Sequence, residues 1–263
     1  MIFYIPKPDF ISVSISNCKL RCKHCMGKYL EQMVKAYSPD ELFKFCEGFN
    51  GKGILISGGF DEYGRLINME KMLSAIKKLK KKLFIAIHPG FLNEKEAENV
   101  AEACDIAFID LPSENAIKNV FGLKSSFEDY MKNMEILIDA GMRVSPHITL
   151  GLNYGEIEEG YVVDRLKEYK VEKVVLNLIV PTAKTEFEKI RLKREEVIEF
   201  IVDAKRKIKN IVIGCMRPRS YDIDFIKNGM SIANPSKEAL KYAEDNSMKA
   251  EFRNYCCGIK EFK

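Results

Sequence analysis

Short apolar runs alternate along the chain with longer segments in which apolar residues recur every three to four positions. Residues 53–57 and 173–180 are runs of Ile, Leu and Val with few polar interruptions, as expected of parallel strands that are buried on both faces. Residues 127–140 and 194–207 have the spacing of amphipathic helices that pack on a sheet. The predicted strands are residues 12–16, 53–57, 83–88, 105–110, 143–150, 173–180, 210–215 and 230–233. The predicted helices are a first one that begins at Pro39, and residues 68–80, 93–104, 127–140, 157–169, 194–207, 222–228 and 236–245.

This regular alternation predicts an α/β fold with eight βα units. The length of 263 residues is close to the roughly 250 typical of one (β/α)8 barrel. No repeat, low-complexity tract or linker divides the sequence. We therefore expect residues 1–263 to form a single TIM-type (β/α)8 or near-complete barrel, with a cysteine-bearing C-terminal tail over about residues 247–263.

Composition narrows the possible partners. The net charge of +4 comes from 42 basic and 38 acidic residues without a dense basic patch, which argues against nucleic acid. No run of 18 apolar residues is present, and residues 1–11 are broken by Pro6 and Pro8, which argues against a membrane span or a signal peptide. We expect a cytoplasmic protein. In that compartment its eight cysteines are better explained by metal binding than by disulfides.

The most informative motif is C-x3-C-x2-C at Cys18, Cys22 and Cys25, just after the first predicted strand. Three thiolates on one tight loop can bind three irons of a [4Fe-4S] cluster and leave the fourth iron open to a small molecule. A zinc site is the alternative. Zinc ribbons and fingers usually need a second pair of ligands, and the sequence has no later C-x2-C or H-x3-H.

The cysteine spacing resembles that of the radical S-adenosylmethionine (radical SAM) superfamily. The resemblance implies that the open iron binds the amino and carboxylate groups of SAM. One-electron reduction, by a donor such as ferredoxin or flavodoxin, then yields a 5′-deoxyadenosyl radical. It also implies SAM contacts from Ser57, Gly58 and Gly59 at the end of the second predicted strand. The acidic residue that usually follows the glycine pair is replaced by Phe60 and then Asp61.

Further SAM contacts follow from the resemblance. His24 stands where relatives carry an aromatic residue near adenine; a solvent-exposed loop histidine is the alternative. Asp110, in F-I-D-L-P-S-E, resembles the strand segment of biotin synthases that binds the SAM ribose; an Asp that starts a turn is the alternative. His147, in H-I-T-L-G-L, and Asn177, in L-N-L-I-V-P, match strand ends that border SAM or substrate in that group. For His147, as for His88, a hydrogen-bonded core histidine is the alternative.

Three later cysteines suggest a second cluster. Cys215 follows the seventh predicted strand, and Cys256 and Cys257 lie near the C-terminus. If the tail folds over the barrel mouth, the three could hold an auxiliary iron–sulfur cluster beside Arg217 or Arg219. The alternative is a buried Cys215 and an incidental vicinal pair.

The resemblance to biotin synthase and, more closely, to compact archaeal lipoyl synthases implies C–S bond formation on a small-molecule or lipoyl-carrier-like substrate. In that interpretation Arg217 is a catalytic residue that binds a carboxylate or phosphate; a structural loop arginine is the alternative. Two other functions stay open. One is a radical SAM maturase or mutase without sulfur insertion, and the other is a non-catalytic iron–sulfur electron carrier.

Overall fold

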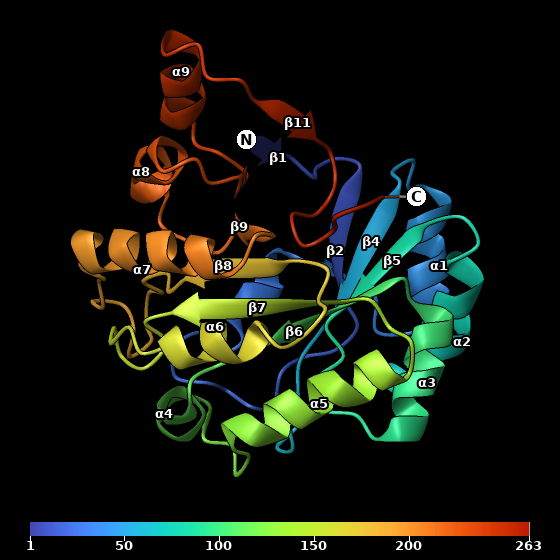
Figure 1. Ribbon diagram of the computed structural model, residues 1–263. Coiled ribbons are helices and arrows are strands. Elements are labelled where there is room, and N and C mark those ends of the chain that lie inside the picture. Colours follow the sequence, from blue (N-terminus) through green and yellow to red (C-terminus); the bar gives the residue numbers. More distant parts are fainter. Residues whose placement is uncertain (263) are drawn as a thin grey trace.

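One curled parallel sheet with helices on its outer side forms the molecule (Figure 1). The computed structural model describes residues 1–262. All strand pairs are parallel, in the order β11-β1-β10-β9-β8-β7-β6-β5-β4-β2-β3. The strands are β1 (Ile2–Tyr4), β2 (Phe10–Ser14), β3 (Val34–Lys35), β4 (Gly53–Ser57), β5 (Phe84–Ile87), β6 (Ile106–Asp110), β7 (Val144–Leu150), β8 (Val174–Leu178), β9 (Ile211–Ile213), β10 (Ile232–Ala233) and β11 (Glu251–Arg253).

The near-complete barrel is confirmed, but the sheet does not close into a (β/α)8 barrel. All eight predicted strands are present, the first displaced by two residues. Within residues 1–262, β2 pairs only with β3 and β4, while β1 pairs with β10 and β11. Strand β1 therefore occupies the edge of β10 that would have to meet β2 in a closed barrel. Strands β1, β3 and β11 were not predicted. Strand β1 lies in the apolar run of residues 1–5, which was considered only as a signal peptide or membrane span, and β3 and β11 have two and three residues.

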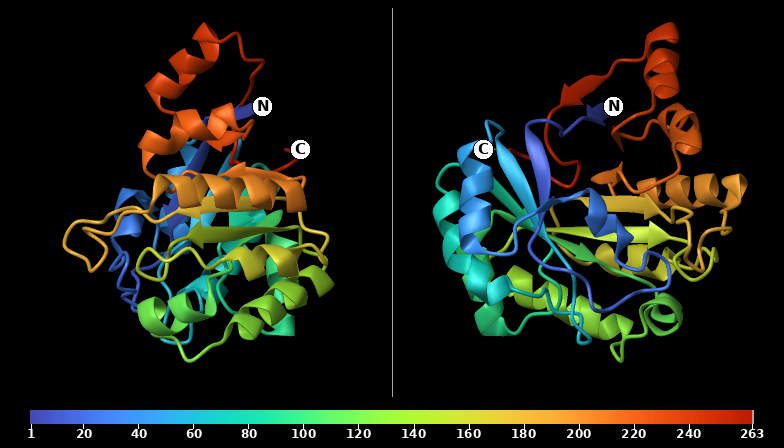
Figure 2. Two further views of the ribbon diagram at one scale, coloured as in Figure 1. Left: turned by 60° about the vertical axis from the view of Figure 1, so that its left-hand side comes forward. Right: turned by 180° about the vertical axis from the view of Figure 1, so that it is seen from behind.

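The helices begin at capping residues that the sequence supplies. Ser38 accepts a hydrogen bond from the Glu41 amide with Pro39 at the first helical position, and Asn93 and Ser126 form complete capping boxes. The helices are α1 (Pro39–Glu47), α2 (Met69–Leu79), α3 (Glu94–Ala103), α4 (Glu114–Ala116), α5 (Phe127–Asp139), α6 (Gly160–Leu166), α7 (Arg194–Lys207), α8 (Asp222–Lys227) and α9 (Lys237–Asp245). Figure 2 shows them along the convex side of the sheet. Within residues 1–262, none is long and apolar enough to cross a membrane.

Alternate residues of each strand face two different apolar cores. Ile85, Ala107 and Ile109 belong to the large core between the sheet and the helices. Phe84, Ala86, Ile106 and Phe108, with Val175 and Val212, belong to a second core on the inside of the curled sheet, which we call the inner core. Because strand side chains alternate with a period of two, His88, Asp110, His147 and Asn177 project to the inside.

The C-terminal tail fills the part of the barrel interior at the amino ends of the strands. Tyr255, Cys257 and Ile259 are buried in the inner core, and the Phe262 ring stacks on Phe84 at 4.9 Å between centroids. Phe84 is the first residue of β5, so the tail enters at the amino ends of the strands, and in Figure 1 the C-terminus lies beside β4 and β5. The expectation that the tail folds over the barrel mouth is wrong, because apolar side chains in the tail complete this inner core.

Candidate functional site

The three motif cysteines lie on the loop that leaves the carboxyl end of β2, where barrel enzymes place their chemistry. The Cys22 carbonyl accepts hydrogen bonds from the amides of Cys25 (3.1 Å) and Met26 (2.8 Å), so the backbone turns tightly between the second and third thiols. The Cys18 sulfur lies 3.8 Å from the Phe60 carbonyl oxygen. The loop thus brings all three thiols to the end of β2 and holds them against the segment that follows β4.

The environment of these thiols suits a metal cluster. Burial raises the pKa of Cys25 to about 11, and burial together with the neighbouring Cys25 and Cys18 raises the pKa of Cys22 further. Without a cation the thiols of Cys22 and Cys25 therefore hold their protons. Metal ions bind the thiolate, so binding of a [4Fe-4S] cluster would release these protons. The donor set and its spacing fit such a cluster, with Cys18, Cys22 and Cys25 as its three ligands.

Gly58 and Gly59 allow the segment after β4 to lie close to the cysteine loop. A Cβ on Gly59 would lie 2.1 Å from both Cα and N of Cys18, and one on Gly58 would lie 2.6 Å from the Ser16 hydroxyl. That hydroxyl accepts from the Gly59 amide at 3.0 Å and donates to the Gly59 carbonyl at 3.1 Å. Only glycine fits at these positions. The contacts of Gly58, Gly59 and buried Ser57 with SAM stay a prediction.

Phe60 and Asp61 replace the usual acidic residue, and the structure gives both a local role. The Asp61 carboxylate accepts hydrogen bonds from the amides of Tyr63 (3.0 Å) and Arg65 (2.9 Å). The Phe60 carbonyl accepts from the amides of Lys19 and Leu20. Asp61 therefore stabilises a turn, and Phe60 ties that turn to the cysteine loop.

His24 lies in an aromatic nest, which we define as Tyr29, Phe121 and Phe187. Their ring centroids lie 5.7, 5.6 and 6.1 Å from that of the imidazole. Burial lowers the pKa of His24 to about 4, so the ring is neutral, and its buried Nδ1 has no hydrogen-bond partner within residues 1–262. The alternative of a solvent-exposed loop histidine is wrong. An aromatic contact with adenine stays a prediction.

His88, Asp110 and His147 converge inside the barrel from β5, β6 and β7. One ligand atom of each lies within 4.8 Å of the others, and the two imidazole centroids are 5.3 Å apart. Burial lowers the pKa of both histidines and raises that of Asp110, while the Asp110 carboxylate partly opposes the shift of His88. Asp110 nevertheless remains accessible to solvent. It therefore borders a hollow inside the barrel. That position is compatible with a ribose contact, which stays a prediction.

Asn177 lies on the inner face of β8 with an unsatisfied polar atom. Its side chain is buried, and its Oδ1 has no hydrogen-bond partner within residues 1–262. The neighbouring strand makes room for it, because a Cβ on Gly214 would lie 2.0 Å from this oxygen. An unpaired buried acceptor is costly, and a bound ligand would satisfy it.

The tail brings Cys256 and Cys257 close to Cys215. Burial and the neighbouring Cys256 raise the pKa of Cys215, whereas the nearby guanidinium groups of Arg217 and Arg219 oppose this shift. A hydrogen bond from the Cys257 thiol lowers the pKa of Cys256. Cys215 stays accessible to solvent. The three thiols thus influence one another's pKa, but within residues 1–262 their sulfur atoms do not all lie within 4.8 Å of one another. Their role as ligands of a second cluster stays a prediction.

Arg217 is held by a buried partner. Its Nε donates to the Asp222 carboxylate at 2.7 Å, and both side chains are fully buried. Its Nη1 donates to the Gly214 carbonyl, whereas its buried Nη2 has no partner within residues 1–262. Nε and Nη1 are therefore committed to holding the end of β9. Its catalytic role stays a prediction and would depend on Nη2.

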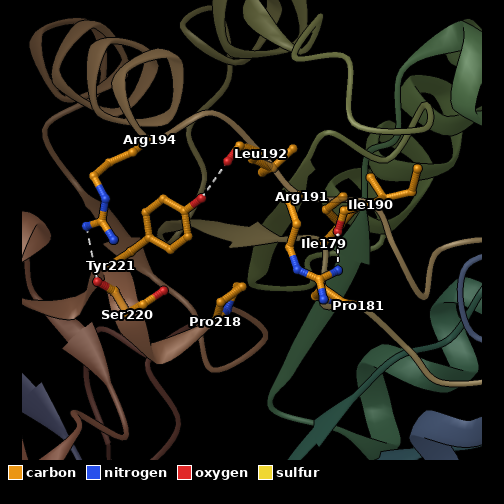
Figure 3. A pocket seen from close by; sticks show the side chains of 9 residues that line it. All are labelled: Ile179, Pro181, Ile190, Arg191, Leu192, Arg194, Pro218, Ser220 and Tyr221. Carbon is orange, nitrogen blue, oxygen red and sulfur yellow. Dashed lines mark hydrogen bonds between the residues drawn. The ribbon is translucent and has the colours of Figure 1, made fainter.

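A pocket of about 310 Å³ opens beside the carboxyl ends of β8 and β9 (Figure 3). Arg194 donates to the Ser220 carbonyl at 3.2 Å, and the Tyr221 hydroxyl donates to the Leu192 carbonyl at 2.9 Å. Arg191 also donates to backbone carbonyls. The lining residues are Ile179, Pro181, Ile190, Arg191, Leu192, Arg194, Pro218, Ser220 and Tyr221. Because the arginines are already paired, the pocket is suited to an apolar ligand group.

Two residues at these sites were not predicted. Ser16 fastens Gly59 to the cysteine loop, and its position two residues before Cys18 is the only sequence signal. Lys173 is buried and donates to the Tyr4 hydroxyl and to the carbonyls of Cys257 (3.2 Å) and Ile259 (2.9 Å). A lysine at the start of a strand carries no sequence signal, because its partners come from both ends of the chain.

Comparisons with known proteins agree with this site. The sequence profile of the radical SAM superfamily matches residues 12–161, more than half of the chain. No curated protein matches the sequence. Among solved structures, methylornithine synthase (PylB) is similar with a TM-score of 0.63 and 14% identity, over 95% of this chain and 83% of that one.

Two further solved structures, both with bound S-adenosylmethionine, are similar at the level of the fold. Streptococcus suis SuiB has a TM-score of 0.57 and 17% identity, over 78% of this chain and 50% of its own length. The protein anSMEcpe has a TM-score of 0.54 and 14% identity, over 85% and 63%. With the cysteine loop, the glycine pair and the profile match in agreement, this chain belongs to the radical SAM superfamily.

Proposed function

We propose that this radical SAM enzyme forms a C–S bond on a small-molecule or lipoyl-carrier-like substrate. The observation that supports this proposal is the second group of thiols, Cys215, Cys256 and Cys257, which lie near enough to influence one another's pKa. With a cluster at Cys18, Cys22 and Cys25, bound SAM supplies a 5′-deoxyadenosyl radical on one-electron reduction. An auxiliary cluster at the second group of thiols would supply the sulfur.

The chain's own residues support this arrangement by position. Asp110 and Asn177 offer acceptors on the inner face of β6 and β8, suited to the ribose hydroxyls and to a polar group of SAM or substrate. His24, held by the aromatic nest, offers a neutral aromatic ring next to Cys25 for contact with adenine. The tail closes the amino ends of the strands, so water is excluded from below the reacting groups.

Lys173 and Arg217 hold the second group of thiols in place. Lys173 donates to the carbonyl of Cys257 itself, and the buried Arg217–Asp222 pair fixes the backbone two residues after Cys215. The free Nη2 of Arg217 is a donor for a carboxylate of the substrate. The apolar pocket beside β8 and β9 can receive an apolar part of the substrate.

The proposal is tested by counting iron and sulfide after anaerobic reconstitution. The wild type is expected to hold about eight irons, and Cys215→Ala/Cys256→Ala/Cys257→Ala about four, as for two cubane clusters and one. Cys46→Ala is the matched control, since Cys46 lies on the outer helix α1, and it should keep about eight. 5′-Deoxyadenosine should form in the triple variant but not in Cys18→Ala. Four irons in the wild type would overturn sulfur insertion and leave a maturase or mutase.

A further inference from the structure

The chain has three histidines, and two of them meet a carboxylate inside the barrel. His88, Asp110 and His147 come from three adjacent parallel strands, and Asp110 and His147 are directly paired in the register of β6 and β7. Their ligand atoms lie within 4.8 Å of one another. A common metal ion at about 2.0–2.2 Å from each ligand atom would therefore require the side chains to rotate toward one another.

The surroundings of the two imidazoles are those of metal ligands. Both rings lie against Phe108, at 5.6 Å for His88 and 5.0 Å for His147 between centroids, so packing limits their orientation. Metal-bound histidines generally donate their second ring N–H to a backbone carbonyl or a carboxylate, and the backbone of Phe108 lies near enough to His88 to oppose the fall in its pKa. Burial favours the neutral imidazole at both positions, and the neutral form is the one that binds metal.

We propose that His88, Asp110 and His147 form a site for a first-row divalent transition-metal ion such as Zn²⁺ or Fe²⁺, with its remaining positions open to the hollow. Two imidazoles and one carboxylate favour these ions over Mg²⁺ or Ca²⁺, which prefer oxygen ligands only. The open positions face the space bordered by Asp110 and would bind an oxygen, nitrogen or sulfur donor of the substrate. The substrate is therefore expected to carry a group that binds a metal ion.

This inference rests on the proposed function only in naming the substrate as the molecule that occupies the hollow. Asp110 is also the residue proposed to accept the ribose hydroxyls of SAM. A carboxylate has two oxygens and about four lone-pair sites, so one oxygen can bind the metal while the other accepts a hydroxyl. The two roles are compatible at one side chain.

The test uses the anaerobically reconstituted full chain, in which cluster iron occupies the thiols. One equivalent of Zn²⁺ is added, its affinity is measured by competition with a chromophoric chelator, and its ligands are identified by zinc X-ray absorption. We expect nitrogen and oxygen ligands with imidazole scattering. His88→Gln and His147→Gln should each weaken binding by about 10- to 100-fold. His24→Gln is the matched control and should leave the affinity unchanged.

Several outcomes would overturn the site. Sulfur ligands, or equal affinity in all three histidine variants, would place the zinc at the cysteines. Variants with wild-type iron content and far-UV circular dichroism establish that the fold is intact; if a Gln variant fails this check, Asp110→Asn takes its place. Formation of 5′-deoxyadenosine is measured in parallel. Its absence with zinc bound refutes the proposed function alone, and its presence without zinc binding refutes this inference alone.

Discussion

Gly59 lies against the backbone of Cys18 so closely that a Cβ on Gly59 would be 2.1 Å from the Cys18 Cα and amide nitrogen. The second residue after β4 and the first cysteine of the motif after β2 thus form one unit. Backbone cannot move aside as a flexible side chain can, so overpacking here displaces the cysteine loop.

Gly59→Ala is expected to lower the free energy of unfolding by about 3 kcal/mol and to reduce iron after reconstitution well below that of the wild type. The measurements are urea unfolding and iron content. Gly160→Ala is the control, since a Cβ on Gly160 meets nothing within 4 Å and alanine favours the helix. Full iron content in Gly59→Ala would contradict the steric argument.

The neutral imidazole of His24 predicts a dependence of stability on pH. Burial lowers its pKa from 6.5 to about 4, so between these values the unfolded chain binds more protons than the folded one. Stability is therefore full above pH 6.5 and decreases as the pH falls toward 4, by at most about 3 kcal/mol from this residue. His24→Phe, which matches the aromatic nest, should flatten this slope in urea unfolding of cluster-free protein. An unchanged slope would show that His24 does not titrate as described.

Lys173 fastens the tail to the barrel. It donates to the Tyr4 hydroxyl and to the Cys257 and Ile259 carbonyls, so Lys173→Met leaves three buried acceptors without a donor. Each unsatisfied acceptor costs about 1–3 kcal/mol, and we expect lower stability with faster proteolysis at the C-terminus. Lys77→Met, which removes only an exposed ion pair with Glu102, should change stability by less than about 1 kcal/mol. Equal protease resistance in both variants would rule out this role for Lys173.

Variants of Arg217 and Asp222 distinguish a structural role of Arg217 from a catalytic one. Asp222→Asn leaves the buried guanidinium without its counter-charge and should cost about 3–5 kcal/mol, measured by thermal or urea unfolding. The control is Asp224→Asn, which breaks the more exposed pair with Arg194 and should cost about 1 kcal/mol or less. If Arg217→Lys keeps stability but loses product formation without losing SAM cleavage, Arg217 binds the substrate. If stability and product formation fall together in Arg217→Lys, the role of Arg217 is structural.

The sequence by itself determined the order of eight strands and of the helices that follow them, and it contains the cysteine motif that predicts the first cluster. Apolar runs at residues 53–57 and 173–180 became β4 and β8, because buried parallel strands require such runs. The Cys18, Cys22 and Cys25 spacing is local, and a tight loop brings its thiols together whatever surrounds it. The capping residues of α1, α3 and α5 are local signals as well.

Only the tertiary structure decided where distant segments meet. The tail could have lain anywhere, but its apolar residues are buried only by entering the barrel beside Phe84 and Phe108. His88, Asp110 and His147 lie on three strands, and their convergence depends on the register and curl of the sheet. The open barrel follows from β1, which pairs with β10, a pairing that its apolar sequence does not reveal. Contacts between residues far apart in sequence depend on packing that no local pattern encodes.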